Sequence, residues 1–167
     1  YYGADETSES IRRIADRVTG ADPAILELGC SSGRHLAHLY EHGYRDLEGI
    51  ELNGDAFEVM DDAYPDLAAA GTFHHDSIEA VVEDVSDDRF DLVYSVETLQ
   101  HIHPDAAWVF DELVRITDGH LVTIENEGGS RDGGAAADAD AAEDVRFVND
   151  EFPLYYRDWH RIFTERG

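Results

Sequence analysis

The sequence predicts an α/β protein, a three-layer α/β/α sandwich built on a mostly parallel sheet. Short apolar segments alternate with longer segments whose apolar residues recur at helical spacing. A glycine-containing turn, ELGCSSG at 27–33, follows the first apolar segment directly. The 167 residues match the usual range of about 100–200 for one domain, so we expect a single domain over 1–167.

Five strands are expected, and the helices between them imply βαβ units with right-handed crossovers. The predicted strands are 24–28, 47–51, 72–75, 90–95 and 120–125. The first helix is expected to be capped by Ser8 or Ser10 and to end at Gly20. The other helices are expected around 36–40, from a cap at Asp55 to the residue before Pro65, over 78–85, and from about 105 to 117.

The C-terminal part has a different composition. Segment 128–144 holds no apolar residue larger than alanine, so we expect a mobile loop near the mouth of a pocket. A short strand is expected over 145–148. A helix is expected to start at Pro153, because five large apolar residues share one helical face: Tyr155, Tyr156, Trp159, Ile162 and Phe163.

The charge of the chain is strongly negative. Asp and Glu number 38 against 12 basic residues, all of them arginine, which gives a net charge of −26. At ~1 M salt the Debye length is about 3 Å and such self-repulsion is screened. The composition therefore favours the cytosol of a salt-accumulating halophile; an ordinary acidic mesophile protein is the alternative. It argues against nucleic acid as a partner.

No membrane span and no secretory signal are expected. No apolar run approaches the ~18 residues that a span requires. No basic region followed by an apolar one opens the chain. The predicted location is cytoplasmic.

The turn at 27–33 indicates a site for a ligand that contains adenosine. Gly29 lets a ligand approach the backbone, and Gly33 lets the next helix pack closely on the strand. Glu51 ends the second strand, where a carboxylate can accept hydrogen bonds from both ribose hydroxyls. Asp76 follows the third strand, where a carboxylate can accept from an adenine amino group. Leu52 and Ile78 would flank the adenine.

Glu27 precedes Gly29 by two residues and suits a ligand with a cationic amino group rather than a pyrophosphate. Here the chain resembles the class I S-adenosylmethionine-dependent methyltransferases of the type 11/12 group, which have a Rossmann-like fold. The motifs that are similar to theirs are ELGCSSG (27–33), GIELN (49–53), HHDSIE (74–79) and FDLVYSVETLQHI (90–102). Ser31 stands where the family often has a second glycine. The composition points to a halophilic archaeon as the source.

The resemblance implies S-adenosylmethionine as the cofactor. It implies eleven cofactor-binding residues: Glu27, Gly29, Cys30, Ser31, Gly33, Glu51, Leu52, Asp76, Ser77, Ile78 and Ser95. It also implies a hairpin after the last helix, for which the sequence up to Gly167 contains no residues. We therefore expect either that the natural chain continues or that a partner covers the edge strand at 120–125.

The residues after the fourth strand are the candidates for catalysis. His101 is a candidate general base, because an imidazole transfers protons near neutral pH; a packed or helix-capping histidine is the alternative. Glu97 is the second candidate, and no metal site is expected. Glu125, at the end of the fifth strand, is expected on a solvated acidic rim, and a contact with the substrate is the alternative.

The acceptor is expected to be a small or sugar-like molecule, because the chain leaves little room for a separate substrate domain. A monomer or weak homodimer is expected. Two alternatives stay open. One is a relative that binds the donor without catalysis, and the other is a nicotinamide-dependent oxidoreductase.

Overall fold

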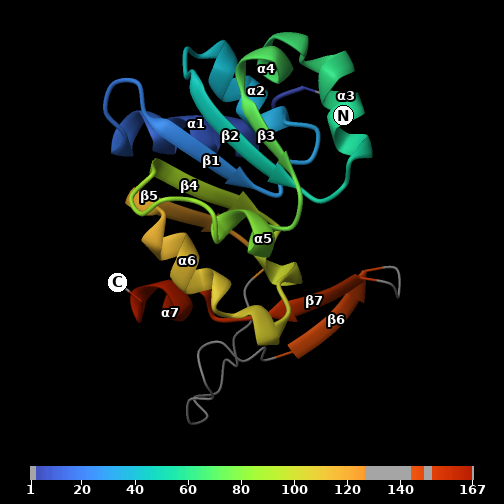
Figure 1. Cartoon of the computed structure of the whole chain (residues 1–167), viewed down its shortest axis with the longest axis vertical. Helices are drawn as coiled ribbons and strands as arrows, with labels where there is room; N and C mark the ends of the chain where they lie inside the picture. Colours follow the sequence, from blue (N-terminus) through green and yellow to red (C-terminus); the bar gives the residue numbers. More distant parts are fainter. Residues whose placement is uncertain (1–2, 127–143, 149–151, 167) are drawn as a thin grey trace.

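A five-stranded parallel sheet forms the centre of the protein (Figure 1). The structure is a computed structural model that describes residues 3–126, 144–148 and 152–166. The strands are β1 (Ala24–Leu28), β2 (Asp46–Glu51), β3 (Thr72–His75), β4 (Phe90–Val96) and β5 (Thr117–Ile124). Their order is β3-β2-β1-β4-β5, and every pairing is parallel. The predicted α/β class and its parallel sheet are confirmed.

Helices cover both faces of this sheet. One apolar core lies between the sheet and α1 (Glu6–Val18), α2 (Arg34–Glu41), α3 (Asp55–Ala63) and α4 (Pro65–Ala70). The other lies between the sheet and α5 (Ile78–Val82), α6 (Val109–Arg115) and α7 (Trp159–Thr164). Two short 3₁₀ helices, η1 (Leu99–His101) and η2 (Pro104–Ala106), connect β4 to α6.

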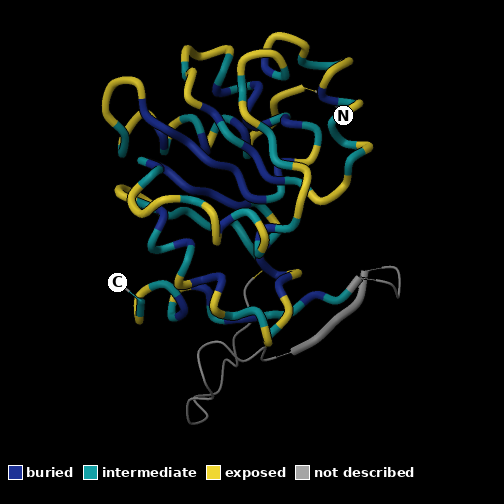
Figure 2. The backbone as a smooth tube through the Cα atoms, in the orientation of Figure 1, coloured by how far each residue is buried: buried dark blue, intermediate teal, exposed yellow. Residues whose placement is uncertain are grey.

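Burial on both faces explains why the two central strands, β1 and β4, are mainly apolar. In β1, Ile25 belongs to the core beneath α1 and α2, whereas Leu26 and Leu28 belong to the opposite core. All five residues of β1 are buried. Figure 2 shows β1 and β4 as the buried centre of the molecule.

The structure corrects several predicted helix ends on the N-terminal side. Asp5 caps α1, because its carboxylate accepts from the Ser8 backbone at 2.9 Å, and Ser8 completes a capping box. Asp55 is the first residue of α3 rather than its cap. Pro65 does end one helix, but it also begins α4, which the sequence analysis missed; proline is well suited to the first turn of a helix.

Two further helices are shorter than predicted. The segment expected as one helix from 105 to 117 is divided into η2 and α6, and β5 already begins at Thr117. Helix α5 ends at Val82 rather than at 85. The Arg115 guanidinium donates to the Val82 carbonyl at 2.9 Å and to the Val85 carbonyl at 2.7 Å. These bonds satisfy backbone carbonyl groups that a longer helix would have satisfied with its own N–H groups.

The helix predicted from Pro153 is wrong. Residues Phe152–Tyr156 form β7, which pairs antiparallel with β6 (Asp144–Val148). This ribbon is separate from the parallel sheet (Figure 1). A proline is tolerated there because a two-stranded ribbon leaves one side of each strand unpaired. Helix α7 starts only after Asp158, whose carboxylate accepts from the Arg161 backbone at 2.9 Å.

The expected strand at 145–148 is confirmed as part of β6. Apart from Asp144, the expected loop at 128–144 lies outside the described residues. Within the part of the chain that the structure describes, β5 is an edge strand of the parallel sheet.

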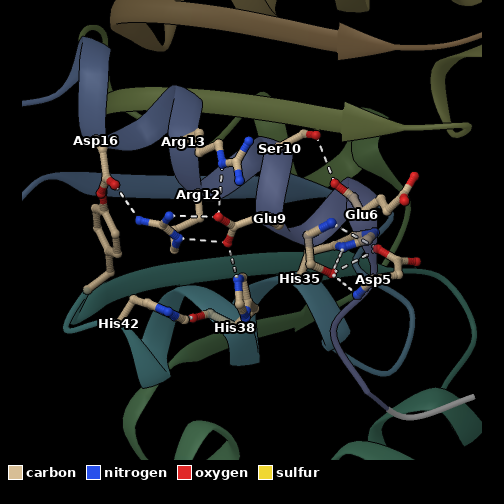
Figure 3. Close-up of polar contacts among 12 residues, drawn as sticks. Asp5, Glu6, Glu9, Ser10, Arg12, Arg13, Asp16, His35, His38 and His42 are labelled. Carbon is tan, nitrogen blue, oxygen red and sulfur yellow. Dashed lines mark hydrogen bonds and ion pairs between the residues drawn. The ribbon is translucent and has the colours of Figure 1, made fainter.

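Helices α1 and α2 are joined by a polar network (Figure 3). The Glu9 carboxylate accepts from Arg12 and Arg13 of its own helix and lies 3.1 Å from Nε2 of His38 on α2. Deeper between the helices, the Ser8 hydroxyl lies 2.8 Å from Nδ1 of His35, and both residues are buried. This network holds α2 in position against α1, and it thereby also positions the turn at 29–33 that precedes α2.

Candidate functional site

A cavity of about 690 Å³ opens where β1 to β4 end. In a parallel α/β sheet, ligands bind at the carboxyl ends of the strands, next to the point where the strand order reverses. Here that point lies between β1 and β4. Eight of the predicted site residues line the cavity: Gly29, Glu51, Leu52, Asp76, Ser77, Ile78, Glu97 and His101.

The turn after β1 requires its glycines. Gly29 has φ +68°, and a Cβ there would overlap the Thr98 hydroxyl. Gly33 has φ +77°, and a Cβ there would lie 2.8 Å from Cε of Met60. Glycine at position 29 therefore lets Thr98, in the segment after β4, pack against the turn. The sequence analysis expected a glycine there only for the access of a ligand.

Ser31 also adopts a left-handed backbone, with φ +48°. Its N–H donates to Oε2 of Glu51 at 2.9 Å, and the Asn53 N–H donates to Oε1 at 2.8 Å. One backbone amide thus holds each carboxylate oxygen of Glu51. The carboxylate is fixed at the cavity wall, and each oxygen keeps a lone pair for a further donor.

Glu27 is buried with only 1% of its surface exposed, and it does not line the cavity. It pairs in register with Tyr94 on β4, whose hydroxyl donates to it at 3.0 Å. Burial raises the pKa of the Glu27 carboxyl well above its usual value. A cationic group beside Glu27 would favour the charged carboxylate and so lower this pKa again.

The Cys30 and Ser95 side chains are engaged elsewhere. Cys30 is buried against β2, where a Cβ on Gly49 would lie 2.7 Å from its Sγ. Burial raises the pKa of this thiol. Ser95 is buried, and its hydroxyl donates to Glu125 at 2.7 Å.

His101 and Glu97 lie at the end of the cavity that follows β4. His101 is exposed, and its Nδ1 lies 3.1 Å from the carbonyl of Pro153 on β7. A carbonyl only accepts, so Nδ1 carries the hydrogen and the neutral ring keeps its lone pair on Nε2. Glu97 has φ +50°, and its N–H donates to the Ile124 carbonyl at 2.8 Å.

Sequence reasoning missed the role of Glu125. Its carboxylate accepts from Ser95 at 2.7 Å and from the backbone N–H groups of Thr98, Leu99 and Gln100 at 3.1–3.4 Å. Burial raises the pKa of this carboxyl despite these bonds. Glu125 therefore anchors η1, which carries His101, instead of lying on a solvated rim.

The β7 strand holds the same segment from the other side. Arg157 is fully buried and donates to the Ile102 carbonyl at 2.7 Å. Pro153 itself lines the cavity. The sequence distinguishes Pro153 only as an expected helix start, and no local pattern marks it as a site residue.

Neither a metal site nor a membrane span is found among the described residues. In residues 3–126 and 152–166, no three His, Cys, Asp or Glu side chains are grouped to hold a metal ion. Within the same part of the chain, no helix has the length and apolar character needed to cross a membrane.

Residues 25–119, which contain β2 to β4, all of β1 except Ala24, and most of the cavity wall, match the protein family described as Methyltransferase domain. The chain belongs to this family. The methyltransferase family expected from the sequence is thereby confirmed, and S-adenosylmethionine is the cofactor of such domains. No curated protein shows a significant sequence match.

Solved structures share the fold of this methyltransferase domain. An S-adenosylmethionine-dependent methyltransferase from Mesorhizobium loti is 21% identical, with a TM-score of 0.73 over 98% of this chain and 82% of that one. The [4+2]-cyclase SpnF is 14% identical, with a TM-score of 0.69 over 95% of this chain and 54% of that one.

A third structure is the geranyl diphosphate C-methyltransferase of Streptomyces coelicolor, in complex with Mg²⁺, geranyl-S-thiolodiphosphate and S-adenosyl-L-homocysteine. It is 15% identical, with a TM-score of 0.55 over 69% of this chain and 42% of that one. The chain spans about half the length of the first matched structures, 50% and 54% of them.

Proposed function

We propose that this protein transfers a methyl group from S-adenosylmethionine to a small-molecule acceptor, with one domain over residues 1–167. The observation that carries the proposal is the cavity at the ends of β1 to β4. It lies largely within the matched methyltransferase region, and the carboxylates of Glu51 and Asp76 line it.

The residues present fit the donor. The Glu51 carboxylate is oriented by two backbone amides and keeps lone pairs for two ribose hydroxyls. Asp76, Ser77 and Ile78 line the part of the wall that follows β3 and would hold the adenine. Glu27 is a buried carboxylate at the end of β1 that would favour the amino group of the donor.

Glycines 29 and 33 shape the turn for the methionine part of the donor, together with the backbone of Cys30 and Ser31. Ser95 contributes to the site through Glu125. Leu52 is exposed at 69% and lines the cavity, so an adenine could cover part of its apolar surface.

Bound S-adenosylmethionine supplies a methyl group that its sulfonium already activates. The protein must therefore mainly align the acceptor for displacement. His101 presents Nε2 as the lone-pair nitrogen because Pro153 holds its Nδ1 hydrogen, and it acts as the general base when the acceptor carries a proton. Glu97 orients the acceptor from the same segment.

A small or sugar-like acceptor suits a cavity of about 690 Å³. The geranyl diphosphate C-methyltransferase of Streptomyces coelicolor offers a precedent for a small acceptor on this fold. The two alternatives, a silent donor-binding relative and a nicotinamide-dependent oxidoreductase, have no specific observation in their favour.

We further propose a cytoplasmic enzyme of a halophilic archaeon, a monomer or weak homodimer that does not bind nucleic acid, on the basis of its charge of −26.

The donor site is tested by replacing Glu51. Glu51→Ala should weaken the binding of S-adenosylhomocysteine at least tenfold in calorimetry at molar KCl, because two charge-assisted hydrogen bonds worth about 1.5–3 kcal/mol each are lost. Glu58→Ala, an exposed carboxylate on α3, is the matched control. Equal affinity of the two variants would refute the placement of the ribose.

A further inference from the structure

One part of the cavity wall is formed by the segment after β4 together with a residue of β7. It is separate from the part of the wall that is assigned to the donor. Glu97, Thr98, His101, Ile102 and Pro153 form it. The proposed donor contacts come from the ends of β1, β2 and β3 instead. An acceptor that meets the donor in this cavity would therefore contact this second part of the wall.

The polar side chains of this part present hydrogen-bond acceptors. The Thr98 hydroxyl donates its hydrogen to the Val96 carbonyl at 3.0 Å. The Nδ1 hydrogen of His101 is used by the Pro153 carbonyl at 3.1 Å. Nε2 of neutral His101 and the Glu97 carboxylate have only lone pairs to offer, and proline has no backbone N–H. A complementary acceptor molecule must bring hydrogen-bond donors.

The charge of the cavity wall favours the same kind of molecule. Four carboxylates line the cavity, those of Glu51, Asp76, Glu79 and Glu97, and no arginine is among the described lining residues. Lysine does not occur anywhere in the chain. A phosphate or carboxylate would meet like charges there and find no cationic partner, whereas an ammonium group would be attracted.

We propose that the acceptor is a primary or secondary amine, bound as an ammonium ion beside Glu97 and methylated on nitrogen. This inference rests on the proposed methyltransferase function. Nε2 of His101 takes one N–H proton, which frees the nitrogen lone pair. That lone pair forms the new C–N bond while the C–S bond breaks and its electron pair returns to sulfur. The products are an N-methylated amine and S-adenosylhomocysteine, and the imidazolium releases its proton to water.

Matched acceptors test the chemical class. The full chain is incubated at molar KCl with methyl-labelled S-adenosylmethionine and three sets of compounds: benzylamine, phenethylamine and hexylamine, the corresponding alcohols, and the corresponding carboxylic acids. Label is expected in N-methylated amines at a rate at least tenfold above the alcohols and acids. Preferential labelling of an alcohol or an acid, or the absence of amine labelling while S-adenosylhomocysteine still binds, would overturn the inference.

A variant tests the residue that recognises the ammonium. Glu97→Gln should raise the KM of the best amine at least tenfold while the affinity for S-adenosylhomocysteine stays unchanged. Glu83→Gln, an exposed carboxylate at the end of α5, is the control and should leave both values unchanged. An unchanged KM in Glu97→Gln would refute the role of Glu97. Failure of the unmodified protein to bind S-adenosylhomocysteine would instead refute the proposed function itself.

Discussion

Glu27 combines deep burial with a single described hydrogen bond, from Tyr94. Its folded-state pKa is raised above the unfolded value, chiefly by burial. Its contribution to stability is therefore fully present below the ordinary glutamate pKa of about 4.3 and is lost as the pH rises. At neutral pH the burial of this carboxyl should therefore lower the stability of the ligand-free protein.

Glu27→Gln should therefore raise the thermal midpoint of the ligand-free protein at pH 8 by about 2–4 °C, the shift that ~1 kcal/mol produces in a domain of this size. The gain should shrink toward pH 5. The same variant should bind S-adenosylhomocysteine more weakly, because the partner of the amino group is lost. Scanning calorimetry at both pH values measures the first effect, and a lower midpoint at pH 8 would show that the charged form is stabilised by the fold.

Glu125 holds η1 through three backbone N–H groups and one hydroxyl. Glu125→Gln replaces one accepting oxygen with a donor, so at least one of these bonds must be lost, at a cost of about 1–3 kcal/mol in stability. We expect kcat to fall at least tenfold well below the melting temperature, because His101 shifts.

Steady-state kinetics beside calorimetry checks this prediction for Glu125, and Glu83→Gln again serves as the control. A merely structural role would lower the melting temperature and leave kcat at low temperature intact, which would contradict a positioning role.

At the scale of elements, the contact between α1 and α2 contains a buried histidine (Figure 3). Burial lowers the pKa of His35 to about 4. Because the folded-state pKa of His35 is lowered, its contribution to the free energy of unfolding is fully present above the unfolded-state pKa of about 6.5. This contribution is lost as the pH falls toward the folded-state pKa. Over that window the loss amounts to about 3 kcal/mol.

Urea unfolding of the unmodified protein and of His35→Gln at pH 7 and pH 5, at constant KCl, should therefore differ: only the unmodified protein has the loss of stability due to His35, whereas both share the opposite effect of Glu27. His35→Gln should lack this loss, because glutamine does not titrate. His42→Gln, which changes an exposed histidine at the end of α2, should retain it. An equal pH dependence in His35→Gln and the unmodified protein would remove His35 as its source.

The whole molecule carries a charge of −26 on 167 residues, with 38 acidic and 12 basic side chains. Several arginines are already paired with carboxylates, as Arg12 is with Glu9 and Arg89 is with Glu48. Most acidic groups therefore repel one another, and screening by salt should stabilise the fold.

We predict that the melting temperature rises steadily from 0.1 to 3 M KCl. Scanning calorimetry over that range measures it, and a NaCl series of equal ionic strength tests whether the effect is general screening. A flat or falling curve in KCl would contradict both the halophilic origin and this account of the surface.

The parallel sheet and the donor side of the cavity could be predicted from local sequence. The strands predicted over 24–28 and 72–75 have the bounds of β1 and β3. The signal is clear for β1, because a buried strand is a short apolar run bounded by turns. Gly29, Glu51 and Asp76 could be located as well, because each directly follows or ends such a strand, and parallel strands bring their carboxyl ends together.

The acceptor side of the cavity depends on contacts between residues far apart in the chain. Glu125 binds the Leu99 backbone 26 residues away, and His101 meets the Pro153 carbonyl 52 residues away. The aromatic residues from Tyr155 onward have helical spacing, yet Phe152–Tyr156 pairs with β6 as a strand. Propensity and spacing describe only neighbours along the chain, whereas strand pairing and hydrogen bonds between distant segments exist only once the sheet and its connections have packed.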